Sequence, residues 1–146
     1  MRYRNVFLML GAMAMTCALS AQTNGNDGLV GVWHGQMETL PAITLNITDE
    51  GGGLSGAVLF YLIKRSSSMS EPTTSTPGIP EPLLNLKRNG NVLEFEVSHR
   101  RAHPPRTLSD APVRFRMTLT APDKAELVNE SEGPDPGFIL TREKQD

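Results

Sequence analysis

The chain has 146 residues and carries 14 Lys and Arg against 16 Asp and Glu, a formal net charge of −2. This balance gives no sign of a nucleic-acid partner or of an anionic membrane surface as a partner, because both favour a clear excess of basic residues. The length suits one hydrophobic core and is too short for two.

Residues 1–21 have the pattern of a secretory signal peptide. Arginines near the start precede an uncharged apolar run over 6–19, and the small residues Ser20 and Ala21 follow it. The run is shorter than the roughly 20 residues that a membrane-spanning helix needs, and no later apolar run is long enough for a span. We therefore expect export to the periplasm or beyond the cell, with cleavage after Ala21 or, alternatively, after Ser20.

Cys17 is the only cysteine, and cleavage would remove it. Lipid attachment at Cys17 is the alternative, but residues 14–16 lack the aliphatic and small residues that usually lead into such a site. A mature chain without thiols has no disulfide, no thiol nucleophile and no thiolate metal ligand. Two arginines leave with the signal and no acidic residue does, so the mature net charge falls to −4.

The mature chain begins with a polar, Gly-rich segment, 22–28, which we interpret as a flexible tether. A strand-like run over 29–38 follows and contains Trp33, the only tryptophan. Gly31 and Gly35 flank Trp33, so small neighbours leave room for one large apolar side chain. We expect the rest of the chain to pack around this residue.

Alternation of apolar and polar side chains predicts the next strand, over 43–48. A Gly-rich turn over 49–53 leads into a more evenly apolar strand over 54–63, which is typical of a strand buried on both faces at one end. From 64 to 82 the composition changes to Ser, Thr and Pro. Such a segment buries little apolar surface, so we predict a long mobile loop there.

The clearest hairpin joins 84–87 to 93–97 through Asn89-Gly90-Asn91, residues that tolerate positive φ. Both strands alternate apolar with polar side chains. The remaining segments are, in chain order, a loop over 100–112, an amphipathic strand over 113–119, a short strand over 125–129, a Pro-rich turn over 133–137 and a last strand over 138–142.

About eight strands without a helical period predict an all-β domain over 29–146, an antiparallel meander that closes into a barrel. Closure removes the exposed edges that invite aggregation. Arg142 has the parity of Phe138 and Leu140 and should therefore point inward at one barrel end. Its guanidinium would then lie over the ring of Trp33.

Gly31-Val32-Trp33 in the first strand, with the inward arginine Arg142 in the last, resembles the signature of the lipocalin and wider calycin group. The spacing of 54–56, 89–95 and 138–142 also resembles small secreted bacterial lipocalin-like domains. The resemblance implies that Trp33 and Arg142 close one barrel end and are structural, and that any ligand enters at the other. Avidins share the opening motif, but their pocket uses several tryptophans, so biotin binding is not expected.

An eight-stranded barrel has room for packed side chains or for one small ligand. We expect a small, mostly apolar ligand, bound without catalysis by the inward residues Leu45, Phe60, Phe95, Phe115 and Met117. The alternative is a filled barrel that acts as a protein-interaction or inhibitor module through its loops. The sequence leaves the ligand's identity and the oligomeric state open.

The only concentrated positive patch contains Arg100, Arg101 and Arg106, which as guanidinium groups are candidates for binding an anion. A solvated loop is the alternative interpretation. His99 and His103 lie in the same segment, and His34 is the third histidine. The surrounding prolines are incompatible with the helix that would bring a four-residue His pair together, and no acidic residue adjoins it, so we predict no metal site.

Other chemical motifs point to no enzyme and no cofactor. Residues 51–56 match Gly-x-Gly-x-x-Gly but lead into a strand, whereas the dinucleotide fingerprint requires a helix that begins there. Glu94 and Glu96 share the polar face of one strand, whereas a glycosidase needs its carboxylates opposed across a cleft. No nucleophile elbow of the serine hydrolases is present.

Overall fold

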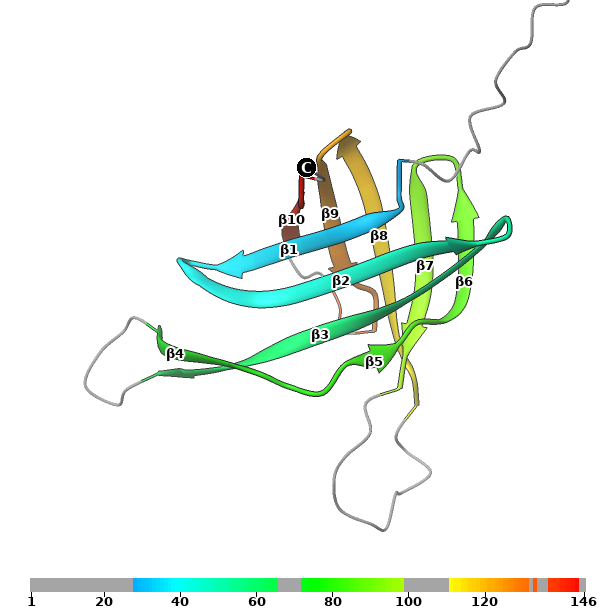
Figure 1. Ribbon diagram of the computed structural model, residues 1–146. Helices are drawn as coiled ribbons and strands as arrows, with labels where there is room; N and C mark the ends of the chain where they lie inside the picture. The colour runs from blue at the N-terminus through cyan, green and yellow to red at the C-terminus, as the bar shows by residue number, and fades with distance from the viewer. Residues whose placement is uncertain (1–27, 66–71, 99–110, 132, 134–136, 145–146) are drawn as a thin grey trace, which may run out of the picture.

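The computed structural model describes residues 28–65, 72–98, 111–131, 133 and 137–144 (Figure 1). These residues form an all-β fold of antiparallel strands, which confirms the predicted class. The ten strands are β1 (Gly31–Met37), β2 (Leu40–Glu50), β3 (Gly53–Arg65), β4 (Pro72–Pro77), β5 (Glu81–Pro82), β6 (Leu84–Asn89), β7 (Val92–Val97), β8 (Val113–Ala121), β9 (Lys124–Asn129) and β10 (Phe138–Arg142). The expected signal peptide and nearly all of the expected tether lie outside the described residues.

Nine strands follow one hydrogen-bonded path in the order β4-β3-β2-β1-β10-β9-β8-β7-β6, and β5 pairs with β3. The sheet curls so that β1 to β3 cross over β7 to β10, with the concave face between them (Figure 1). One contact across this face joins Phe60 of β3 to Phe115 of β8, whose ring centroids lie 5.7 Å apart. The curl therefore creates a core from a single sheet.

The segment 81–89 contacts strands from both halves of this path. Its first part pairs with β3, where Glu81 lies opposite Val58, and the backbone N–H of Leu83 donates to the carbonyl of Gly56 at 3.0 Å. Its second part, β6, pairs with β7. The change of partner coincides with a register shift after Leu84, the kind of irregularity that lets a strand bend.

The prediction of a loop from 64 to 82 is wrong for much of that segment. Lys64 and Arg65 belong to β3, and residues 72–77 form β4, which pairs with 61–65. Ser and Thr are compatible with an extended backbone, and Pro72 and Pro77 stand at the two ends of a strand that is last in the sheet order, where a missing N–H is tolerated. These additional short strands explain why ten are present and about eight were expected.

The tight hairpins lie where the glycines predicted them. Gly51 and Gly52 have φ of 72° and 94° between β2 and β3, and the Gly52 N–H donates to the Asp49 carboxylate at 2.6 Å. Gly90 has φ of 61° between β6 and β7. Residues without a Cβ adopt these angles at no steric cost. The motif at 51–56 is therefore a hairpin turn followed by a strand.

Trp33 is completely buried, and its indole Nε1 donates to the carbonyl of Leu29 at 2.9 Å. Arg142 lies directly opposite Trp33 on β10, and its Cζ is 5.6 Å from the centroid of the Trp33 ring. The guanidinium also donates to the carbonyl of Val30. A Cβ on Gly31 would come within 2.8 Å of Arg142 Nε, so the space beside Trp33 that glycine leaves is occupied by the arginine.

Candidate ligand-binding site

The five side chains predicted to line the interior all belong to the concave face, but at different depths. Leu45 and Met117 are completely buried and form part of the central hydrophobic cluster. Phe95 and Phe115 are also buried, whereas Phe60 is only half-buried and packs against the cluster. Leu45, Met117, Phe95 and Phe115 are therefore core residues, and of the five only Phe60 lies nearer to solvent.

The three phenylalanines form a continuous aromatic row. Phe95 and Phe115 are cross-strand partners on β7 and β8, with ring centroids 5.7 Å apart and planes inclined by 20°. Phe60 reaches Phe115 from β3 at the same centroid separation and an inclination of 32°. Both separations are in the range for attractive aromatic pairs. The row thus passes from the buried core to a ring that solvent reaches.

Leu62 extends this apolar surface outward along β3. It lies two residues after Phe60 and therefore on the same face of the strand. Its side chain is 61% exposed. An apolar side chain left open at the end of an aromatic row gives a surface against which the apolar part of a small molecule can pack.

Glu81 is a residue of this face that the sequence analysis did not identify. It pairs with Val58, which is buried, and cross-strand partners point to the same side of a sheet. Glu81 is half-buried and its Oε2 is inaccessible to solvent. The only available signal was the order Glu81-Pro82-Leu83, in which Glu81 and the buried Leu83 alternate with an exposed proline. Because 64–82 was predicted to be a loop, this alternation was not interpreted as a strand.

The predicted anion-binding residues Arg100, Arg101 and Arg106 lie outside the described residues, and so do His99 and His103. His34, the third histidine, lies on the outer face of β1. Of these residues the structure describes only His34, and it does not bring His34 to the aromatic row. Within the described part of the chain, no group of three His, Cys, Asp or Glu side chains is arranged to hold a metal ion.

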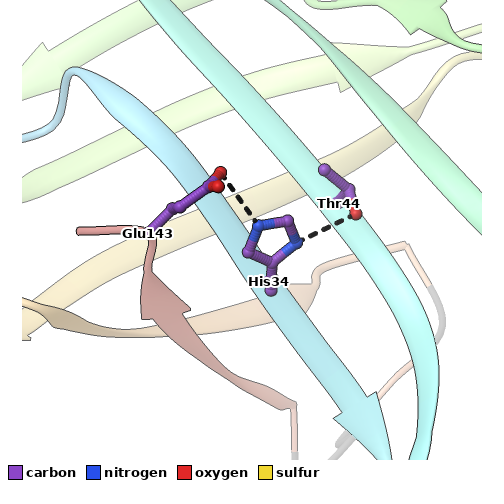
Figure 2. Close-up of polar contacts among 3 residues, drawn as sticks. All are labelled: His34, Thr44 and Glu143. Carbon is purple, nitrogen blue, oxygen red and sulfur yellow. Dashed lines mark hydrogen bonds and ion pairs between the residues drawn. The ribbon is translucent and has the colours of Figure 1, made fainter. Parts of the chain in front are cut away.

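His34 links two neighbouring strands on the outer face (Figure 2). Its Nδ1 lies 3.2 Å from the hydroxyl of Thr44 on β2, and its Nε2 lies 3.3 Å from the Glu143 carboxylate just after β10. Hydroxyl, imidazole and carboxylate in this order resemble a nucleophile, a base and an orienting group. However, the side chains of His34 and Glu143 are 47% and 60% exposed, whereas such groups act in a water-excluded site.

An open groove of about 840 Å³ lies beside His34, where β1 and β10 continue past their last paired residues, Gly35 and Leu140. The side chain of Ile139 on β10 is 63% exposed and lines this groove. A smaller polar groove of about 250 Å³ runs over β6 to β8. The residues that line the larger groove are His34, Gln36, Met37, Glu38, Gly137, Phe138, Ile139 and Thr141.

Comparison with protein-family models, with curated proteins and with solved structures found no match. The lipocalin-like resemblance therefore stays a prediction from the sequence. The described residues contain no helix that is long and apolar enough to cross a membrane.

Proposed function

We propose that this protein is an exported, lipocalin-like binding protein that holds the apolar part of a small ligand and performs no chemistry on it. The aromatic row of Phe60, Phe115 and Phe95 carries the proposal. Aromatic rings offer large, rigid contact surfaces, and ligand sites typically combine such surfaces with a few polar groups.

The ligand occupies the outer end of the row. The side chains of Leu45 and Met117 are packed within the hydrophobic core. The side chains that a ligand can contact are therefore Phe60, Leu62 and the accessible edge of Phe115. This binding surface is smaller than the five-residue pocket expected from the sequence. A ligand that binds there does not require a hollow barrel interior.

In this proposal the sheet closes into a barrel through the segment 81–89, which hydrogen-bonds to β3 and to β7. Trp33 and Arg142 then close one end, as in the lipocalin group, and residues 1–21 direct export. The cation–π contact and the hydrogen bond from Arg142 to Val30 support a structural role for this pair.

The second candidate is a protein-interaction module that acts through its outer face. The groove between the diverging ends of β1 and β10, with the exposed side chain of Ile139, favours it. In that case the concave face serves only as the core. The two candidates differ in which apolar residues a ligand would need.

A fluorescence titration with the neutral apolar dye N-phenyl-1-naphthylamine separates them. We expect saturable binding that Phe60→Ala weakens by roughly fivefold to tenfold, the loss of part of one aromatic contact. Ile139→Ala, on the outer face, is the matched control and should leave the affinity unchanged. Unchanged affinity in folded Phe60→Ala protein, or a loss confined to Ile139→Ala, would exclude the concave site.

A further inference from the structure

One guanidinium nitrogen of Arg65 joins the end of β3 to the turn between β1 and β2. Arg65 Nη2 lies 3.2 Å from Glu38 Oε1 and 3.9 Å from Met37 Sδ. This nitrogen carries a pair of N–H groups, so it donates one to the carboxylate and directs the other at the sulfur. Because a thioether sulfur is only a weak acceptor, the second contact adds little to the first.

Met37 is also open to small molecules from solvent. Its side chain is half-buried and lines the groove of about 840 Å³ beside His34. Met117, the other methionine in the part of the chain that the structure describes, is completely buried in the core. A small polar oxidant therefore reaches Met37 and not Met117.

From this arrangement we propose that Met37 is a site of reversible oxidation by hydrogen peroxide, and that its sulfoxide ties the β1–β2 turn to β3 through Arg65. The sulfur gives an electron pair to one oxygen of the peroxide, the O–O bond breaks, and the other oxygen leaves as water with both hydrogens. The sulfur is thereby oxidised and the peroxide reduced, and methionine sulfoxide reductases reverse the change. The modification goes beyond the proposed function, since it requires no bound ligand.

The sulfoxide oxygen is a better partner for Arg65 than the sulfur. It is bonded to the atom that Nη2 already faces, and the flexible methionine side chain lets it turn toward the guanidinium. Hydrogen bonds from a charged donor are stronger than those between neutral groups. A half-buried polar oxygen also needs such a partner, because its burial without one would destabilise the fold. Oxidation therefore strengthens the contact between the turn and β3 only where Arg65 is present.

The test treats the folded protein with hydrogen peroxide and combines peptide mass mapping with thermal unfolding of treated and untreated samples. We expect Met37 to be oxidised while Met117 stays reduced. Treatment should raise the melting temperature by about 2–3 °C, the size expected for one exposed hydrogen bond to a charged donor in a chain of this length. Met37→Leu and Arg65→Gln should abolish this rise. Glu38→Gln is the matched control, because it removes the ion pair but keeps the guanidinium, and it should keep the rise.

Each outcome decides a different point. If Met37 stays reduced at peroxide concentrations that oxidise free methionine, or if Met117 reacts equally fast, Met37 is not the site. If Met37 is oxidised and the melting temperature does not rise, the sulfoxide does not tie the turn to β3. If the rise persists in folded Met37→Leu or Arg65→Gln protein, its assignment to this pair is wrong. The mapping and the first melting comparison use the wild-type chain, so they do not depend on a variant that folds.

Discussion

Replacement of Arg142 by methionine tests the contacts around Trp33 most sharply. Methionine keeps a long apolar side chain but removes the guanidinium that lies 5.6 Å from the Trp33 ring and donates to the Val30 carbonyl. A partly buried cation–π contact contributes about 1 kcal/mol, and a hydrogen bond from a charged donor about 1.5–2 kcal/mol. The variant should therefore lose about 2.5–3 kcal/mol of unfolding free energy.

Urea unfolding, followed by the fluorescence of the only tryptophan, measures this loss directly. With a slope of about 2 kcal/mol per molar urea, the midpoint should fall by about 1.2–1.5 M. Arg116→Met is the matched control, because its contact with Glu130 is an exposed ion pair worth about 1 kcal/mol at most. If the Arg142→Met midpoint falls no further than that of Arg116→Met, the guanidinium does not stabilise this end of the sheet and the reasoning fails.

Two further substitutions probe the packing of the core. A Cβ on Gly35 would meet Ile43 Cγ2 at 2.5 Å and Leu140 Cδ2 at 2.8 Å, so Gly35→Ala should cost about 1–3 kcal/mol by overpacking; a melting temperature equal to that of the wild type would show that β1 can move away. Leu45→Ala should cost about 2–5 kcal/mol because Leu45 is completely buried. Leu62→Ala, at an exposed position, should change the unfolding free energy by less than about 0.5 kcal/mol, and equal losses for the two leucines would contradict the assigned depths.

Local signals in the sequence were sufficient for most of the sheet. Alternation along 93–97 and 113–119 predicted two amphipathic strands, and these are the adjacent strands β7 and β8 with Phe95 opposite Phe115. Turn residues with positive φ fixed the hairpins at 51–52 and at Gly90. Such features depend on neighbours in the chain, and therefore sequence alone reveals them.

Features that depend on pairing partners were not predictable in the same way. Residues 72–77 carry no apolar alternation, and they are ordered as a strand because β3 extends beyond β2 and offers them a partner. Glu81 lies on the concave face because it pairs with Val58. The contact of His34 with Glu143 joins residues 109 positions apart. In each case the feature depends on a partner strand that is distant in the sequence, and local propensity does not reveal that partner.

In the candidate site, too, some features follow from the local sequence and others depend on distant parts of the chain. Parity placed Phe60, Phe95 and Phe115 on one face, and they form a connected aromatic row. Parity says nothing of depth, so it did not distinguish Leu45 and Met117, which are packed in the core, from Phe60, which is half-buried. Depth is set by how far the sheet curls, a property of the whole chain.

The most direct test of the proposed binding site is methyl NMR of the protein with labelled Ile, Leu and Val side chains, recorded with and without N-phenyl-1-naphthylamine. Leu62 and Val58 report on the concave face, and Ile139 reports on the outer groove. Binding at the aromatic row predicts shifts of the Leu62 and Val58 methyl signals, with those of Ile139 unchanged. Shifts of Ile139 alone, with Leu62 and Val58 unaffected by saturating dye, would contradict the proposal.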